Sequence, residues 1–255
     1  MSRKTVQFRH SFRTVTPYIV VAAAEEMIAF VKQVFGAEET FRAESSPGSI
    51  HAEVRIGDSM MMIGGGHAYK GPAKPAAIRV YVENSDESYR RALDAGAIST
   101  LEMTDNLGER FGCVQDVFGN QWIISTPVGA HYIPGYQRSV TPFIYAQSAA
   151  RFIDFVKQAF SGEELLKVDL PEGKVKHAVI RIGDSVIATG DLREGSMPSL
   201  PTMLYLYVPD VDTVYDQAIR AGAQSIHAPV DQPYGDRNGG VTDEWGNQWY
   251  IATPL

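Results

Sequence analysis

The sequence contains very little cysteine and no long apolar run. Cys113 is the only cysteine among 255 residues, which excludes an internal disulfide and a metal centre built on several thiolates. The longest apolar stretch, residues 18–24, is far too short to cross a bilayer. The basic stretch at residues 1–13 is not followed by the apolar core of a signal peptide. We therefore expect a cytoplasmic protein that does not enter the membrane.

Positive charge is also scarce. Lys and Arg number 23 against 30 Asp and Glu, so the formal net charge is −7, and no Lys/Arg cluster stands out. Nucleic acids and anionic membrane surfaces are bound by basic patches, so the charge argues against both as partners. The apolar fraction of 44% is ordinary for a globular chain, and the length allows one large domain or two of average size.

The two halves of the sequence repeat each other. The matched segments are "VTPYIVV" (15–21) with "VTPFIYA" (140–146), "FVKQVFGAEE" (30–39) with "FVKQAFSGEE" (155–164), "RIGDS" at 55–59 and 181–185, and "FGNQWIISTP" (118–127) with "WGNQWYIATP" (245–254). The offset grows from 125 to 127 residues along the chain, which is the size of a whole domain and too long for a solenoid repeat. We therefore predict two tandem domains, residues 1–132 and 133–255, that form an intramolecular pseudo-dimer.

Each copy contains one secondary-structure pattern twice. A short β-rich strand comes first, and a helix follows in which Met27, Phe30, Val31 and Val34 form one apolar stripe. Alternating segments around Gly57 and Asp58 then predict a β-hairpin. The whole chain is therefore predicted to be an α+β protein of four β-α-β-β-β units, with helices on one face of each mixed sheet and the other face free.

These phrases, together with "HAEVRIGDS" (51–59) and "YGDRNGGVTDEWGNQWYIAT" (234–253), resemble the vicinal oxygen chelate superfamily and its PhnB-like branch. That superfamily includes glyoxalase I, extradiol dioxygenases, fosfomycin-modifying enzymes and bleomycin-binding proteins. The resemblance implies two glyoxalase-like domains with cup-shaped sheets. It also implies a divalent metal in enzymes of the group, held by His, Glu or Gln from the first and fourth strand of each unit. One scaffold here carries several functions, so the resemblance does not fix the activity.

The metal positions that the resemblance implies are not occupied by metal ligands in this sequence. They fall on Thr16, Met62, Ala77, Ile123, Thr141, Ala188, Met203 and Tyr250. None of these side chains supplies an imidazole or a carboxylate, which hard divalent cations require. The exception is His51 with Glu53, which share one face of a strand and could supply two ligands to a metal ion. The second copy has His177 and Val179 at these positions, so it lacks the carboxylate. We expect no family metal and no other cofactor.

Strand alternation predicts which side chains face away from the helices. Ile78 and Val80 suit the helix side, which turns Arg79 and Tyr81 to the open face. The candidate ligand-binding residues obtained in this way are Tyr18, His51, Glu53, Arg55, Arg79, Tyr81, Phe143, His177, Arg181, Tyr205, Tyr207 and Tyr250. Arg79 and Arg55 could hold a carboxylate or phosphonate, because guanidinium groups match such anions. For Arg55 and Arg181 we favour the structural alternative, in which they pair with Asp58 and Asp184 across the turn.

Three functions remain open from the sequence. The first is binding of a small anionic or aromatic molecule without the family metal. The second is a lyase, isomerase or dioxygenase, either with an unusual metal set or with His51 as a metal-independent general base. The third is a non-catalytic, pseudo-dimeric scaffold. A homodimer of the chain is compatible with each of them.

Overall fold

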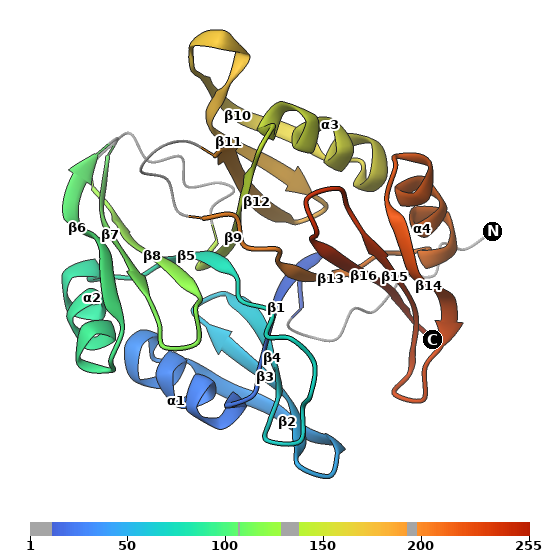
Figure 1. Ribbon diagram of the computed structural model, residues 1–255, viewed down its shortest axis with the longest axis horizontal. Coiled ribbons are helices and arrows are strands. Elements are labelled where there is room, and N and C mark those ends of the chain that lie inside the picture. The colour runs from blue at the N-terminus through green and yellow to red at the C-terminus, as the bar shows by residue number, and fades with distance from the viewer. Residues whose placement is uncertain (1–11, 107, 129–137, 193–197) are drawn as a thin grey trace. The chain divides into compact units, whose positions relative to one another are not determined.

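The computed structural model describes residues 12–106, 108–128, 138–192 and 198–255. Four successive groups of elements follow one another along the chain, each with a strand, a helix and three further strands (Figure 1). The first group is β1 Val15–Val21, α1 Ala24–Phe35, β2 Glu38–Ser46, β3 Ser49–Ile56 and β4 Ser59–Gly65. The second is β5 Ala77–Tyr81, α2 Ser85–Asp94, β6 Ile98–Asn106, β7 Glu109–Gln115 and β8 Gln121–Pro127.

The same series recurs in the second half of the chain. The third group is β9 Val140–Ala146, α3 Ala149–Phe160, β10 Glu163–Asp169, the short 3₁₀ turn Pro171–Gly173, β11 Val175–Ile182 and β12 Ser185–Asp191. The fourth is β13 Met203–Tyr207, α4 Val211–Arg220, β14 Gln224–Asp231, β15 Asp236–Thr242 and β16 Gln248–Pro254. The predicted α+β class with four β-α-β-β-β units is therefore confirmed.

The strands form two mixed sheets of eight. Their strand orders are β14-β15-β16-β13-β1-β4-β3-β2 and β10-β11-β12-β9-β5-β8-β7-β6. Hairpin neighbours pair antiparallel, whereas β1 and β5 pair parallel with β4 and β8, the last strand of their own group. The strand order therefore places groups one and four in one sheet and groups two and three in the other. Neither sheet is made from two groups of the same half of the chain.

The chain divides into two compact units. The first-half unit is Pro17–Ile144, and the second-half unit is Tyr145–Leu255 together with the residues up to Thr16. Strands β1 and β9 therefore each begin in one unit and continue in the other. The domain boundary predicted between residues 132 and 133 lies outside the described residues.

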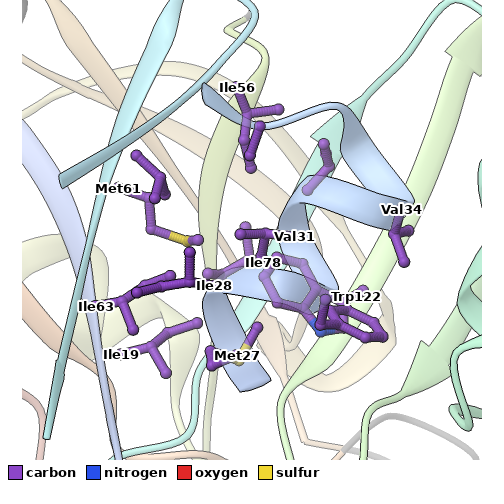
Figure 2. Packing of buried hydrophobic residues seen from close by; sticks show 14 of the residues in the cluster. Ile19, Met27, Ile28, Val31, Val34, Ile56, Met61, Ile63, Ile78 and Trp122 are labelled. Atoms are coloured by element: carbon purple, nitrogen blue, oxygen red, sulfur yellow. The ribbon is translucent and has the colours of Figure 1, made fainter. Parts of the chain in front are cut away.

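Helix α1 packs into the core of the first-half unit. Its residues Met27, Ile28, Val31 and Val34 are almost fully buried, and the helix ends at Gly36, whose φ of 65° is the left-handed conformation that glycine tolerates best. Figure 2 shows these side chains among apolar residues from the sheets. Those residues are Ile19, Ile56, Met61, Ile63, Ile78 and Trp122. The predicted apolar stripe is confirmed.

The repeated phrase "GNQW" belongs to a hydrogen-bonded turn in each unit. The carboxylate of Asp116 accepts the backbone N–H groups of Phe118 and Asn120, the Asn120 amide, and the indole N–H of Trp122 at 2.8 Å. Asp243 accepts the equivalent donors, including the indole of Trp249 at 2.9 Å. Each turn therefore lets a completely buried tryptophan keep a partner for its N–H.

The side chains of the repeated phrase "GDS" accept hydrogen bonds from the backbone of the residues at the start of β9 and β1. In the first-half unit, Asp58 accepts the backbone N–H of Ser139 at 2.9 Å, and Ser59 Oγ accepts that of Val140 at 3.1 Å. In the second-half unit, Asp184 and Ser185 accept the backbone N–H groups of Thr14 and Val15 in the same way, at 2.8 and 2.9 Å. The segments R-[ST]-V-T-P at 13–17 and 138–142 thus each dock onto a G-D-S turn.

Among the described residues, no helix is long and apolar enough to cross a membrane.

Candidate functional site

The open face of β5 carries a charged cluster. Ile78 and Val80 are fully buried in the core, so Arg79 and Tyr81 point to the opposite face, as strand alternation predicts. Arg79 Nη1 donates to Glu109 Oε2 and lies 3.4 Å from the Tyr81 hydroxyl, which itself donates to Glu109 Oε1 at 2.9 Å. The Arg79 and Glu109 side chains are only 16% and 15% exposed, so this ion pair is largely withdrawn from water.

Aromatic rings cover the guanidinium of this cluster. Arg79 Cζ lies 5.8 Å from the ring centroid of Tyr81 and 5.9 Å from that of Phe111, within the range of cation–π attraction. Burial raises the pKa of Tyr81 above its ordinary value, although the neighbouring guanidinium acts against this. The Tyr81 hydroxyl therefore stays protonated at neutral pH and remains a hydrogen-bond donor.

Three buried polar atoms beside this cluster have no hydrogen-bonding partner among the described residues: Arg79 Nε, Ser125 Oγ and Thr141 Oγ1. The strand register brings their residues together. Arg79 is opposite Thr141 on β9, and Tyr81 is opposite Ser125 on β8. Buried polar groups in native proteins are nearly always satisfied by protein, water or a bound molecule. Three such atoms lie on the adjacent strands β8, β5 and β9.

A second polar cluster lies on the open face of β1 and β3. The Tyr18 hydroxyl and His51 Nδ1 are 2.9 Å apart, and His51 Nε2 lies 3.7 Å from Glu53 Oε1. The Tyr18 and His51 rings meet edge to face at 5.4 Å, and Phe41 approaches the imidazole at 6.3 Å. Glu53 is only 7% exposed and pairs in register with Met62. The structure thus brings together three of the predicted residues from the first half.

The positions that the resemblance implies for a metal do not fit one. Thr16, Met62, Ala77, Ile123 and the four residues at the equivalent strand positions of the second half are hydroxyl, thioether or hydrocarbon side chains. Within the described parts of the chain, no three His, Cys, Asp or Glu side chains gather in a way that could hold a metal ion. The side chains at these positions therefore do not fit a divalent cation.

The face of β13 away from the helices has a different chemistry, and its residues Tyr205 and Tyr207 are buried. Tyr205 stands where β5 has Arg79, and its hydroxyl donates to Asp236 at 3.0 Å. The Tyr205 and Tyr207 rings are 5.0 Å apart, and on β16 Tyr250 lies 6.1 Å from His227. Burial, followed by the charge of Asp236, raises the pKa of Tyr205 above its ordinary value. This face is therefore tyrosine-rich and acidic, with a tyrosine at the position of the first-half guanidinium.

Two predicted arginines lie outside these clusters. Arg55 and Arg181 are exposed and pair with Glu38 and Glu163, so the expected pairing with Asp58 and Asp184 is wrong. Phe143 is buried on β9, and His177 is half-buried on β11. Glu109, Asp236 and Ser125 are not among the residues predicted from the sequence. Their one signal in the sequence is the match of "LGER" (107–110) to "YGDR" (234–237), which repeats an acidic residue before an arginine.

The units of one strand, one helix and three strands, with polar clusters on the sheet face away from the helices, define a glyoxalase-like protein. Residues 138–251 match the family model described as Glyoxalase/Bleomycin resistance protein/Dioxygenase superfamily. An uncharacterised protein of Mycobacterium bovis is 33% identical over 127 residues, which are 46% of this chain and 84% of the relative. A protein of Mycobacterium tuberculosis H37Rv is also 33% identical over 127 residues, which are 46% of this chain and 75% of that protein. The chain belongs to this superfamily.

Solved structures show the same fold over the length of the chain. Glyoxalase I from Zea mays has a TM-score of 0.75 at 13% identity, with 94% of this chain and 92% of the Zea mays chain covered. A candidate dioxygenase of Bacillus subtilis has a TM-score of 0.63 at 12% identity, with 94% of this chain and 84% of that chain covered. At this level of identity the likeness concerns the fold alone.

Proposed function

We propose that this protein binds a small anionic molecule at the Arg79 face, without the metal of its enzymatic relatives. We further propose that it is a tandem pair of PhnB-like domains. One observation carries the first proposal: Arg79 Nε, Ser125 Oγ and Thr141 Oγ1 are buried, with no partner in the described parts of the chain, around a largely buried guanidinium. A carboxylate or phosphonate offers acceptors to such donors, and a guanidinium supplies two parallel N–H groups to each of these anions.

The arrangement explains how the protein stabilises the largely buried guanidinium of Arg79. Glu109 and the Tyr81 hydroxyl hold Arg79 in one orientation when no ligand is bound. Phe111 and Tyr81 form an apolar and aromatic wall beside the charge. Few polar groups within apolar walls are typical of small-molecule sites, and a positioned arginine reduces the entropy lost on binding.

The experiment is calorimetric titration of the purified protein with methylphosphonate, inorganic phosphate and benzoate, with elemental analysis of the same sample. We expect one of these anions to bind, and Arg79→Lys and Thr141→Val to weaken that binding about tenfold or more. Arg55→Lys is the matched control, because Arg55 is exposed and pairs with Glu38. Equal affinity in Arg79→Lys and wild type, or no binding of any of the three anions, would contradict the proposal.

The rival functions make different predictions in the same samples. A lyase, isomerase or dioxygenase of the metal-dependent type requires a stoichiometric divalent ion, and His51 with Glu53 would be its first ligands. A non-catalytic scaffold requires that no small molecule binds to either unit. We also propose that the protein is a cytoplasmic intramolecular pseudo-dimer that can form a homodimer. We propose no nucleic-acid or membrane partner, which the acidic net charge supports.

A further inference from the structure

We infer that Tyr18, His51 and Glu53 form a metal-independent proton-transfer site, separate from the anion site at Arg79. The three side chains come from two strands of one unit and form a continuous series. Tyr18 lies on β1, and His51 and Glu53 lie two residues apart on β3, facing the same way. The Arg79 cluster is built from other residues, so this inference does not depend on the proposed anion binding.

The proposal places the ring proton of His51 on Nε2, the nitrogen that faces the Glu53 carboxylate at 3.7 Å, a contact longer than a hydrogen bond. Nδ1 is then an acceptor, and the Tyr18 hydroxyl at 2.9 Å donates to it. A hydroxyl, an imidazole and a carboxylate in this order form the arrangement by which proteins activate a hydroxyl group.

Gly64 provides the space that this arrangement requires. In register it lies opposite His51 on β4. A Cβ at Gly64 would lie 2.5 Å from the Tyr18 hydroxyl oxygen and 2.8 Å from its ring. The absence of a side chain at position 64 therefore lets the phenol reach the imidazole.

The second half carries different residues at the two outer positions of the series. By the sequence repeat, Phe143 stands for Tyr18, His177 for His51 and Val179 for Glu53. A phenylalanine has no hydroxyl to activate, and a valine has no carboxylate to stabilise an imidazolium. The proton-transfer chemistry is therefore assigned to the first half alone.

The step is a transfer of one proton with no change of oxidation state. The O–H bond of Tyr18 breaks as His51 Nδ1–H forms, and Glu53 stabilises the resulting imidazolium. The Tyr18 phenolate then takes a proton from the bound molecule, which is left as its conjugate base. The Tyr18 hydroxyl then gives its proton to another atom of that molecule while His51 Nδ1 returns its own proton to the Tyr18 oxygen, which restores the starting state. Phe41 near the imidazole and Met62 beside Glu53 suit a largely apolar substrate with one weakly acidic proton.

An electrophilic probe tests the activated hydroxyl without knowledge of the substrate. Benzenesulfonyl fluoride reacts when the phenolate oxygen attacks sulfur, an S–O bond forms, the S–F bond breaks and fluoride leaves. We expect mass spectrometry to find Tyr18 labelled faster than the exposed Tyr234, and His51→Ala to slow labelling of Tyr18 about a hundredfold. Added imidazole should restore part of the rate in His51→Ala, which a purely structural histidine would not allow.

Controls separate this inference from folding and from anion binding. His177→Ala should leave the labelling of Tyr18 unchanged, and Tyr18→Phe should abolish it while leaving anion affinity at wild-type strength. Glu53→Gln should slow labelling, and Glu53→Asp should recover part of the rate. If His51→Ala does not fold, His51→Gln serves in its place. Labelling of Tyr18 no faster than that of Tyr234, or at wild-type rate in the His51 variant, would overturn the inference.

Discussion

Thr141 lies directly opposite Arg79 in the antiparallel register of β9 and β5, and each of the two residues buries a polar atom that lacks a partner among the residues the structure describes. Leaving a donor unsatisfied in this way costs stability, about 1–3 kcal/mol for each group. A sheet face with several unsatisfied polar atoms lowers the free energy of unfolding. Functional sites often carry such a cost in stability.

Thr141→Val should therefore stabilise the protein by about 1 kcal/mol, because it replaces an unsatisfied hydroxyl with a methyl group of similar shape. Urea unfolding followed by circular dichroism measures the change. Ser59→Ala provides the contrast, because Ser59 Oγ accepts a backbone N–H and its removal should destabilise the protein. Loss of stability in Thr141→Val would show that the hydroxyl has a partner in solution.

Glu109→Gln should destabilise the first-half unit by roughly 3 kcal/mol, because it leaves the guanidinium of Arg79 largely buried without its counter-charge. Thermal and urea unfolding both report this loss. Glu38→Gln removes the exposed partner of Arg55 and should change stability little. Similar effects for the two variants would mean that water reaches Arg79 as freely as it reaches Arg55.

Asp116→Asn should destabilise the protein by about 2 kcal/mol or more, because the amide nitrogen would meet donors at the position where a carboxylate now accepts them. Asp243→Asn makes the same change in the other unit and should have a similar effect. Fluorescence of the buried tryptophans during unfolding provides the measurement. A neutral result in both variants would refute the structural role given to the repeated "GNQW" turn.

Gly64→Ala should cost about 1–3 kcal/mol of stability, because its methyl group collides with Tyr18. The cost should be smaller when Tyr18 is already alanine, and a double-mutant cycle measures this coupling. Additive effects of the two substitutions would mean that the phenol does not lie over position 64 in solution.

The free energy of unfolding should fall above pH 9 because the buried thiol of Cys113 loses its proton less readily in the folded protein than in the unfolded chain. Burial raises the pKa of Cys113 from its ordinary value of 9.0 to about 11, although the nearby Arg79 acts against this. The unfolded chain therefore loses the thiol proton first, so the stability contribution is complete below pH 9 and is lost between pH 9 and 11, roughly 2–3 kcal/mol in all. Cys113→Ala should remove this part of the pH dependence, and iodoacetamide should modify the native thiol slowly at pH 8. Rapid native modification at pH 8 would contradict the burial.

The sequence predicts the secondary structure and the faces of the strands because both depend on local periodicity. Ile78 and Arg79 are neighbours in the chain and point to opposite faces, as alternation requires. The partners of the charged residues are not local. Arg55 was expected to pair with Asp58 three residues away, yet Glu38 is its neighbour in the register of β2 and β3, and Arg181 and Glu163 repeat this pairing on β11 and β10. These ion pairs form between residues that lie opposite each other on neighbouring strands. The register of β2 against β3 cannot be read from the order of residues in the sequence.

The cluster around Arg79 was only partly predictable for the same reason. Arg79 and Tyr81 were found by alternation, whereas Glu109 reaches them from β7, thirty residues further along the chain from Arg79. Ser125 and Thr141 become notable only when the register shows them beside β5 with buried hydroxyls that no described residue satisfies. Gly64 likewise has a meaning only once Tyr18 is seen to occupy its side-chain space.

The docking of R-[ST]-V-T-P segments onto G-D-S turns has a consequence for any attempt to separate the two halves of the chain. Asp58 holds Ser139 and Asp184 holds Thr14, so neither half satisfies its turn with its own leading segment. Either half expressed alone would therefore lack the backbone donors that its turn accepts, so dividing the chain between the halves should leave both turns to be satisfied by water.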